Sequence, residues 1–516
     1  MKVSKEHGNK LVAVIDIGST AIRQVIAEIH TGGEWRMIDH AERPVSLGRD
    51  VFMTGNIDRQ TLSQSLQILL RYSEVLRGWQ IGSADTHVFA TSALREAKNR
   101  DTFVDRMEHQ TGFKINIIEG IEENRLTYMA VKHALRNAKL KFSKLNSLII
   151  EVGGGSTEML LLERGKIVVA HTMSIGTVRI EQQLKSIFGS ADYLYRFVTE
   201  NIRAAGEVIE IEFRLKRIKN FIAVGADVRL AARRVGKPVD RQHAVIEKSD
   251  FDEFVNQLQD LSVDDCVHKF QIPYTDAEGL LLALRIYQLF LDMTSATRLI
   301  VPNVSIRDGM ILSLSRKPDP RIQEELNSQV LASAVSLGRK YSFDEKHARH
   351  VAALSLSLFD QLEAEHGIDR ESRLLLEVAA ILHDIGTFVR TSGHHKHGQY
   401  LVTNAEIFGL PRDDINIVSN VVRYHRKALP LPSHINYISL PRERRILVSK
   451  MAAILRVADA LDKGHMQRIE AITVEKRGDD LMVHPSHDGD ISIERYGLAQ
   501  KANMMEEVFG MKVVLL

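Results

Sequence analysis

Residues 11–20 read Leu11-Val12-Ala13-Val14-Ile15-Asp16-Ile17-Gly18-Ser19-Thr20. The apolar, β-branched run at the start is typical of a buried strand, and the glycine after it is typical of a tight turn. Glycine lets backbone N–H groups approach an anion, and the two hydroxyl side chains that follow can donate further hydrogen bonds. The stretch therefore predicts a phosphate-binding loop at the carboxyl end of a strand.

The same pattern recurs near residue 150. That stretch reads Leu148-Ile149-Ile150-Glu151-Val152-Gly153-Gly154-Gly155-Ser156-Thr157-Glu158. Carboxylates beside a phosphate chain repel it unless a hard cation lies between them, and Mg²⁺ is the usual cation. We therefore expect the two loops to bind phosphate from opposite sides, with Mg²⁺ held by Asp16, Glu151 and Glu158. Either loop alone is also compatible with a simple strand connection, and it is the pair that favours phosphate.

The pattern of strands and helices divides the chain into four parts. Residues 1–137 alternate strands and helices, and residues 138–316 repeat that plan, which indicates two similar α/β lobes enclosing a cleft. After Pro318-Asp319-Pro320, long helical segments rich in Leu, Ala and His predict a helical domain over residues 317–468. Short strands around a helix then predict a small α+β domain over residues 469–516.

Composition restricts the class of protein. The 68 basic and 66 acidic residues give a net charge of +2, which is too small to indicate a nucleic-acid partner. The single cysteine, Cys266, excludes an internal disulfide framework and fits a reducing compartment. The sequence has no apolar stretch long enough for a membrane span, and its N-terminus lacks the apolar core of a signal peptide. We therefore expect a cytoplasmic protein with no membrane partner.

Three further motifs accompany the two loops. They are Ala90-Thr91-Ser92-Ala93-Leu94-Arg95-Glu96-Ala97, Ile118-Glu119-Gly120-Ile121-Glu122-Glu123-Asn124-Arg125-Leu126 and Ser305-Ile306-Arg307-Asp308-Gly309. Over nearly its whole length the chain resembles the exopolyphosphatase and guanosine pentaphosphate phosphohydrolase family. The resemblance implies an α/β actin-like (ribonuclease H-like) duplicated two-lobe fold, followed by an all-α HD-type domain and a small α+β segment. It also implies a homodimer that uses Mg²⁺ to hydrolyse the terminal phosphate of inorganic polyphosphate, of guanosine pentaphosphate (pppGpp), or of both.

The resemblance also assigns roles to residues. Glu123, the second acid of the family's Glu-Glu pair, is the candidate that orients or deprotonates the attacking water, and Glu122 is the alternative. Neighbouring side chains point in different directions, so only one of the two can face the cleft. Arg95 is expected to bind phosphate with its planar guanidinium. The expected phosphate-binding set is Gly18, Ser19, Thr20, Arg95, Gly153, Gly154, Gly155, Ser156 and Thr157.

Two positions depart from the family pattern. Glu151 stands where relatives usually carry Asp, which places the carboxylate one methylene further out. Asp227, in Gly225-Ala226-Asp227, stands where members commonly carry an uncharged residue near the nucleoside of ATP-binding relatives. The added charge argues against nucleotide binding and against a kinase, and it favours polyphosphate.

The helical part carries a second set of candidate ligands. His347, the adjacent pair His383-Asp384, and Asp459 resemble the ligands of the HD phosphohydrolase superfamily, which converge on a divalent metal. Mixed nitrogen and oxygen ligation suits Mn²⁺, Fe²⁺, Zn²⁺ or Mg²⁺. Four more histidines, His394, His395, His397 and His425, are candidates for a second metal position or for direct phosphate binding. The sequence leaves open whether this site is catalytic.

Basic residues lie close to these histidines in the sequence. Arg423, Arg426 and Lys427 are predicted to form a track for polyphosphate. Aromatic residues make up only 6% of the chain, so a base-stacking platform for nucleic acid is unsupported. A solvated helix face is the simpler alternative.

Three functions remain open from the sequence. The first is an exopolyphosphatase, and the second is a pppGpp phosphatase. The third is a regulator whose α/β lobes sense a phosphorylated ligand while the HD-type domain performs the hydrolysis.

Overall fold

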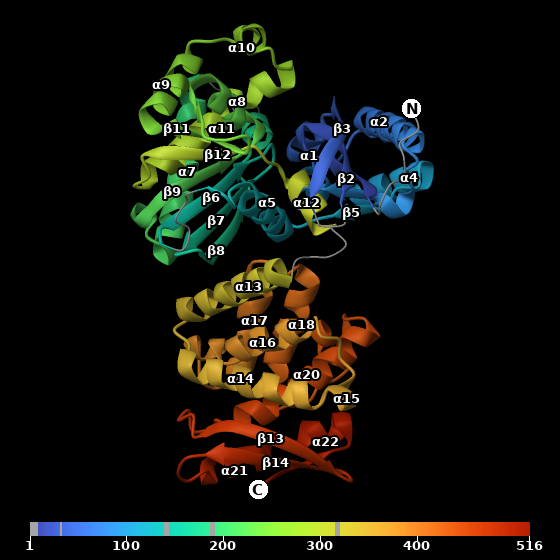
Figure 1. Cartoon of the computed structure of the whole chain (residues 1–516), viewed down its shortest axis with the longest axis vertical. Coiled ribbons are helices and arrows are strands. Elements are labelled where there is room, and N and C mark those ends of the chain that lie inside the picture. The colour runs from blue at the N-terminus through green and yellow to red at the C-terminus, as the bar shows by residue number, and fades with distance from the viewer. Residues whose placement is uncertain (1–8, 31–33, 139–143, 186–190, 315–319) are drawn as a thin grey trace. The chain divides into compact units, whose positions relative to one another are not determined.

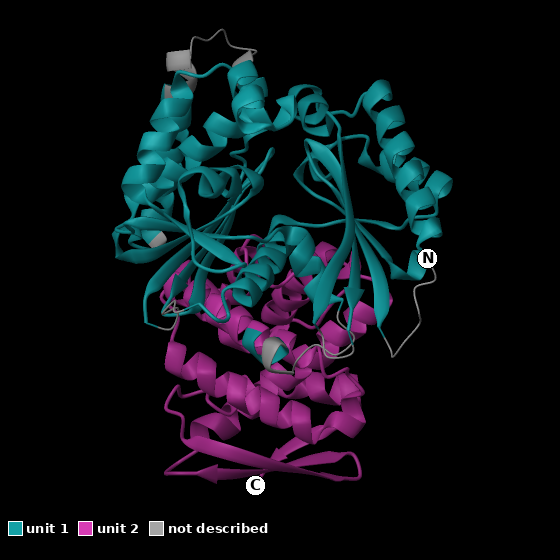
Figure 2. Ribbon diagram, turned by 45° about the horizontal axis from the view of Figure 1, so that its top comes forward, with its two compact units in different colours: residues 1–325 teal, residues 326–516 magenta. Residues whose placement is uncertain are grey.

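The computed structural model describes residues 9–30, 34–138, 144–185, 191–314 and 320–516 (Figure 1). The chain forms two compact units, Met1–Glu325 and Leu326–Leu516 (Figure 2). The division falls within helix α13 (Pro320–Lys340). Of the predicted Pro318-Asp319-Pro320 boundary, Pro318 and Asp319 lie outside the described residues.

The first lobe of unit 1 is built on a five-stranded sheet with the order β3-β2-β1-β4-β5. The first three strands are antiparallel, and β4 and β5 continue the sheet parallel to β1. The predicted strand at the start of residues 11–20 lies within β1. The elements are β1 (Lys10–Ile17), β2 (Ala21–Ile29), β3 (Trp35–Pro44), α1 (Leu47–Thr54), α2 (Arg59–Gly78), β4 (Thr86–Ala90), α3 (Ser92–Glu96), α4 (Arg100–Thr111), β5 (Ile115–Ile117) and α5 (Gly120–Ala134).

The second lobe repeats this plan with a seven-stranded sheet, β10-β11-β12-β9-β6-β7-β8. Again three antiparallel strands come first, and β9 and β12 follow in parallel. The elements are β6 (Asn146–Val152), β7 (Thr157–Glu163), β8 (Lys166–Met173), α6 (Thr177–Lys185), α7 (Ala191–Glu212), β9 (Ile218–Val224), α8 (Ala226–Val235), β10 (Lys237–Pro238), β11 (His243–Glu247), α9 (Lys248–Gln259), α10 (Val263–Phe270), α11 (Tyr274–Met293), β12 (Arg298–Pro302) and α12 (Ile306–Ser313). The repeated strand order confirms the predicted duplicated actin-like fold.

Helices α5 and α12 pack together between the two sheets (Figure 1). Helix α5 contacts β7 and β8 of the second sheet. Although α12 comes after the second lobe in the sequence, it packs on β1 of the first, where Ile306 and Ile311 join Val12, Val14 and Leu126 in one apolar cluster. The contacts of α5 and α12 therefore connect the first sheet to the second.

Unit 2 is a bundle of helices followed by a small sheet. Its core gathers apolar side chains from α13 through to β15 in one cluster. The three strands have the order β13-β14-β15, as the predicted α+β segment requires. The elements after α13 are α14 (Glu345–Gln361), α15 (Glu363–His366), α16 (Arg373–Leu382), α17 (His394–Thr403), α18 (Arg412–Tyr424), α19 (Ile435–Ile438), α20 (Arg442–Ala460), β13 (Ile469–Arg477), β14 (Asp480–His487), α21 (Ser492–Lys501), α22 (Asn503–Phe509) and β15 (Lys512–Leu515).

A bilayer crossing requires a long helix with an almost uncharged apolar surface. None of the helices in the described ranges meets that requirement.

Candidate active site and metal cluster

The two glycine loops face each other in unit 1. Each is closed by a hydrogen bond of its own, from the Gly18 N–H to the Ala21 carbonyl (3.0 Å) and from the Gly153 N–H to the Ser156 carbonyl (2.9 Å). A Cβ added at Gly154 would lie 3.1 Å from the Cβ of Ser19. A side chain at Gly154 would therefore press on the opposite loop, and glycine allows the two loops to approach this closely.

The loops line a cavity of about 280 Å³. Asp16, Glu123, Glu151 and Glu158 contribute carboxylates to its wall, from β1, α5, β6 and β7. Of the predicted phosphate-binding set, the lining includes Gly18, Ser19, Thr20, Gly153, Gly154 and Ser156. The two loops are distant in sequence, and they meet because β1 and β6 both end at this cavity.

Glu123 lies in the first turn of α5. Arg95 donates one hydrogen bond to its carboxylate at 2.6 Å and another to the Ile118 carbonyl at 2.6 Å. Burial raises the pKa of Glu123 to about 7, although the charge of Arg95 opposes that shift. Arg95 therefore orients Glu123 from behind, and it is not itself among the residues lining the cavity.

Glu122 points elsewhere, as adjacent positions on a helix must. Its carboxylate binds Arg125 through two hydrogen bonds of 2.7 Å. It is absent from the cavity lining that the structure describes, and so are Gly155 and Thr157. The Thr157 hydroxyl donates to the Ile175 carbonyl at 2.6 Å, so it stabilises the loop from outside the cavity.

The carboxylates of the second loop fit a divalent cation. Glu151 and Glu158 lie directly opposite each other on β6 and β7, an arrangement in which like charges repel. Their hydrogen-bond donors are neutral hydroxyls, from Thr127 (2.7 Å) and Ser156 (2.6 Å). Burial raises the pKa of both carboxyls, and at Glu158 the charge of Glu123 adds to the increase. Mg²⁺ between these oxygens would relieve both the repulsion and the burial of unpaired charge.

Asp16 is already paired with a cation. Arg307, in the first turn of α12, donates to its carboxylate at 2.9 Å. The return of α12 to the first sheet is what brings Arg307 to this position. Asp16 and Arg307 thus form an ion pair within the cavity wall.

The arginines of the wall were not predicted from the sequence as site residues. Arg23, Arg229, Arg233 and Arg307 all line the cavity. Arg229 donates to the Val304 carbonyl at 2.7 Å, which fixes its guanidinium near the loop before α12. The only sequence feature that pointed to any of them is the motif at residues 305–309, which contains Arg307.

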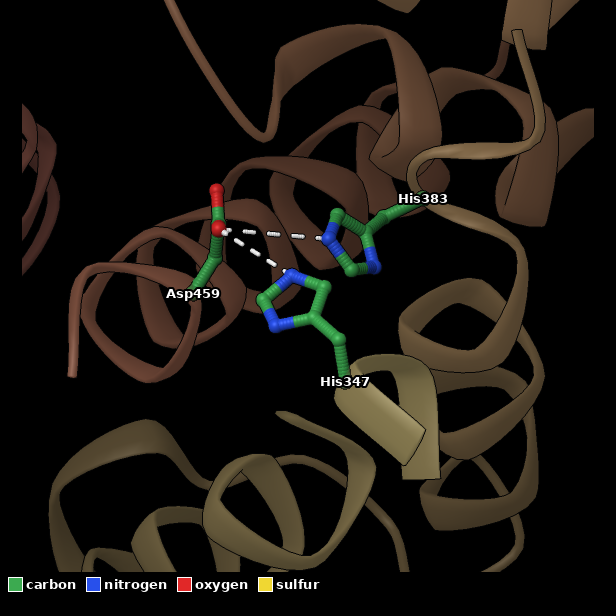
Figure 3. A group of neighbouring side chains, drawn as sticks. All are labelled: His347, His383 and Asp459. Carbon is green, nitrogen blue, oxygen red and sulfur yellow. Dashed lines mark ion pairs between the residues drawn. The ribbon is translucent and has the colours of Figure 1, made fainter. Parts of the chain in front are cut away.

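Unit 2 brings the four HD-type candidates together. The Nε2 atoms of His347 (α14) and His383 (after α16) each lie 3.9 Å from one carboxylate oxygen of Asp459 (α20), and both rings face it (Figure 3). His383 Nε2 also lies 3.7 Å from Asp384 Oδ2. Among the described residues, the buried Nε2 atoms of His347 and His383 have no hydrogen-bond partner. Three ligand atoms that converge without satisfying one another fit a metal ion.

One residue of the predicted polyphosphate track, Arg426, lies beside His394. Arg426 Nη1 approaches the ring of His394 at 3.2 Å, and Arg423 and Lys427 are its neighbours in sequence. The structure therefore places Arg426 at the histidines of unit 2.

Two family models match the chain. Residues 25–317 match the Ppx/GppA phosphatase family, and residues 331–488 match Ppx/GppA phosphatase, domain III. Known proteins to which the chain is similar include two that carry the name guanosine-5'-triphosphate,3'-diphosphate pyrophosphatase. The one from Photobacterium profundum is 21% identical over 87% of this chain and 85% of its own length. The one from Pseudoalteromonas translucida is 24% identical over 86% of this chain and 86% of its own length. A solved exopolyphosphatase from Cytophaga hutchinsonii shares the fold of 59% of this chain and 98% of its own, with 17% identity and a TM-score of 0.52.

Proposed function

We propose that this chain, which belongs to the Ppx/GppA phosphatase family of phosphoanhydride hydrolases, releases terminal orthophosphate from inorganic polyphosphate in the cleft of unit 1. The observation that carries the proposal is that carboxylates, arginines and both glycine loops line the same cavity. Phosphoryl transfer requires positioning and charge neutralisation more than covalent chemistry, and this wall offers both.

Glu123 is the residue that we assign to the attacking water. A general base works best when its pKa lies near the working pH, and burial raises the pKa of Glu123 to about 7. Arg95 holds the carboxylate in one orientation, which fixes the direction of the water that it binds. Asp16, Glu151 and Glu158 would hold Mg²⁺, which when bound neutralises phosphate oxygens and polarises the phosphorus.

The described wall favours an inorganic chain as the substrate. Arg23, Arg229 and Arg233 add positive charge to the wall beyond the two loops, where Glu42, Asp227 and Asp276 also lie. The described residues that line the cavity include no aromatic side chain on which a guanine could stack.

The alternative substrate is pppGpp, because the two similar proteins named above carry that activity in their names. A competition assay separates the two. Purified protein is given Mg²⁺ with long-chain polyphosphate and pppGpp together, and the release of phosphate from each is followed. We expect polyphosphate to have the higher kcat/KM by at least about tenfold, the effect of about 1.4 kcal/mol. A preference for pppGpp would assign the cleft to the alarmone instead.

A second candidate function is hydrolysis in unit 2, with the α/β lobes acting as a sensor. The buried Nε2 atoms of His347 and His383, which have no hydrogen-bond partner among the described residues, favour it. Glu123→Gln and His383→Ala distinguish the two: loss of polyphosphate hydrolysis in the first variant alone supports the cleft. Loss in the second alone would make unit 2 the active centre.

A further inference from the structure

We infer that Arg179, in the first turn of α6, is a positioning residue for the reaction in the cleft of unit 1. Its guanidinium fixes the Gly155 carbonyl of the second glycine loop, and Glu96 and Phe52 of the first lobe hold that guanidinium in place. The loop is therefore set for phosphate while the two lobes are in contact. This inference rests on the proposed hydrolysis in the cleft, and it adds a residue that lies outside the described cavity lining.

Three successive carbonyls of the second glycine loop bind the start of α6. The Thr177 N–H donates to the Gly153 carbonyl at 3.0 Å, and the next two N–H groups of the helix donate to the Gly154 carbonyl at 2.9 and 3.0 Å. The third carbonyl, that of Gly155, accepts a hydrogen bond from Nε of Arg179 at 2.7 Å. Backbone groups thus hold the first two carbonyls, and a side chain holds the third.

These contacts decide where the N–H groups of the loop point. In a trans peptide the carbonyl and the following N–H point in opposite directions. The N–H groups of Gly154, Gly155 and Ser156 therefore point away from the donors of α6, and within the described parts of the chain they donate no hydrogen bond. Successive N–H groups of this kind are suited to bind an anion, and Gly154 and Ser156 line the cavity. Through the Gly155 carbonyl, Arg179 sets the direction of the Ser156 N–H.

The first lobe holds the guanidinium of Arg179. Its Nη2 donates to a Glu96 carboxylate oxygen at 2.5 Å, and its Cζ lies 4.2 Å from the centre of the Phe52 ring. Glu96 ends α3 and Phe52 lies in α1, which packs against α6. An arginine can make these contacts together with the bond to the Gly155 carbonyl, because its planar guanidinium has several donors and stacks on aromatic rings. The Arg179 side chain is only 12% exposed, so water competes little for these partners.

Gly155 is the point at which the second loop contacts the first lobe. A Cβ added there would lie 2.4 Å from the Phe52 ring and 2.4 Å from the Ser92 hydroxyl. Both of these side chains come from the first lobe, from α1 and α3. A glycine at this position therefore permits the lobes to touch, although Gly155 is not among the described residues that line the cavity.

A single side chain thus connects the contact between the lobes with the phosphate loop. Where Glu96 and Phe52 move away with the first lobe, Arg179 loses both of its contacts with that lobe and the Gly155 peptide is less restrained. Rotation of this peptide turns the Ser156 N–H out of position. A preorganised donor at a developing charge is one of the larger contributions to catalysis, so hydrolysis is favoured only when the lobes are together.

Arg49 provides a matched comparison. It also joins the lobes, through a close ion pair between α1 and Glu278 in α11. Its described hydrogen bond goes to that carboxylate and not to a glycine loop. A residue that acts only by holding the lobes together should therefore behave like Arg49, and a residue that sets the loop should not.

The first test compares these two arginines. Arg179→Ala should lower kcat about 10- to 100-fold, because a misdirected donor is nearly as costly as a missing one. Arg49→Gln should leave kcat within about twofold. Arg179→Lys should resemble Arg179→Ala, since an ammonium cannot reproduce the guanidinium contacts, and free guanidinium should restore part of the activity of Arg179→Ala. Equal losses in Arg49→Gln and Arg179→Ala, or an alanine variant that guanidinium does not restore, would overturn the inference.

The activity of Glu123→Gln separates this inference from the proposed function. All variants are assayed with Mg²⁺ on polyphosphate and on pppGpp. Glu123→Gln with the activity of the parent protein would overturn the cleft as the active site, and the role of Arg179 with it. An inactive Glu123→Gln beside a fully active Arg179→Ala would overturn the role of Arg179 alone.

The second test measures the coupling to the first lobe. Glu96→Gln should lower kcat/KM about fivefold in the parent protein and have no further effect in Arg179→Ala, because Glu96 acts through Arg179. Orthophosphate, used as a competitive inhibitor, should show a Ki that rises about tenfold in Arg179→Ala and stays unchanged in Arg49→Gln. Effects of Glu96→Gln and Arg179→Ala that simply multiply, or a Ki that Arg179→Ala leaves unchanged, would contradict the inference.

Discussion

At the scale of single residues, the adjacent acids Glu122 and Glu123 provide a matched pair. One is paired with Arg125 and the other faces the cleft, although they share charge, length and helix. Glu123→Gln should lower kcat for polyphosphate at least about 100-fold with little change in KM, because the shape remains and the base is lost. Glu122→Gln should leave kcat within about threefold, since its carboxylate forms only a partly exposed ion pair. Equal losses in the two variants would remove Glu123 from its assigned role.

Asp227 allows a prediction that depends on pH. Burial raises its pKa to about 7, and the charge of Asp276 adds to the increase. Below this pKa the side chain is neutral, so Asp227→Asn should change little at pH 6. Above it the carboxylate repels a polyanion, so the substitution should lower KM for polyphosphate about two- to fivefold at pH 8. The ratio of KM values for the two proteins at the two pH values is the measurement, and a ratio independent of pH would contradict it.

The same residues show what sequence reasoning reached at this scale. It identified the acids and glycines, because each lies within a few residues of a recognisable strand end. It did not reach Arg23, Arg229 or Arg233, whose positions in the cavity depend on how separate elements pack. It also assigned Gly155 and Thr157 to phosphate, whereas in this structure Thr157 binds the Ile175 carbonyl. Local patterns predict loops well, but they do not predict which atoms of a loop face inward.

At the scale of elements, the packing position of helix α12 is the feature that no local pattern revealed. The predicted lobe boundary at residue 316 groups it with the second lobe, but it packs on β1 of the first lobe. The motif at residues 305–309 marks the start of α12 in the sequence. The place where α12 packs is set by apolar contacts with residues almost 300 positions earlier in the chain. The family resemblance, which the match over residues 25–317 confirms, was the only route to this part of the site.

The crossing of α12 and α5 can be tested through Gly309. A Cβ at this position would overlap the backbone of Leu126, which cannot move without shifting α5. Gly309→Ala should therefore cost about 1–3 kcal/mol and lower the melting temperature of unit 1. Gly78, in α2, is the control, because a Cβ there meets nothing within 4 Å. Gly78→Ala should be neutral or stabilise by up to about 1 kcal/mol, and a similar loss in both variants would count against the crossing.

At the scale of the whole molecule, the two units have separate cores. The core of unit 2 begins at Val330 and contains no residue of the α/β lobes. Each unit also has its own candidate metal site with different chemistry, carboxylate oxygens in unit 1 and imidazole nitrogens with carboxylates in unit 2. Calorimetry of the full chain should therefore resolve two unfolding transitions. An ion that prefers oxygen ligands should stabilise unit 1, and an ion that accepts imidazole nitrogen should stabilise unit 2.

Mn²⁺ should raise the transition of unit 2 in particular. The buried Nε2 atoms of His347 and His383 have no hydrogen-bond partner among the described residues, so an ion that binds them stabilises only the folded state. A cation present at 100 times its Kd contributes about 2.7 kcal/mol. For a unit of this size each kcal/mol shifts the melting temperature by about 2–4 °C, which gives an expected rise of about 5–10 °C. Glu123→Gln should keep this rise, because its side chain belongs to unit 1, and His383→Ala should lose it. A rise that survives His383→Ala would place the ion elsewhere and remove the physical basis for a metal centre in unit 2.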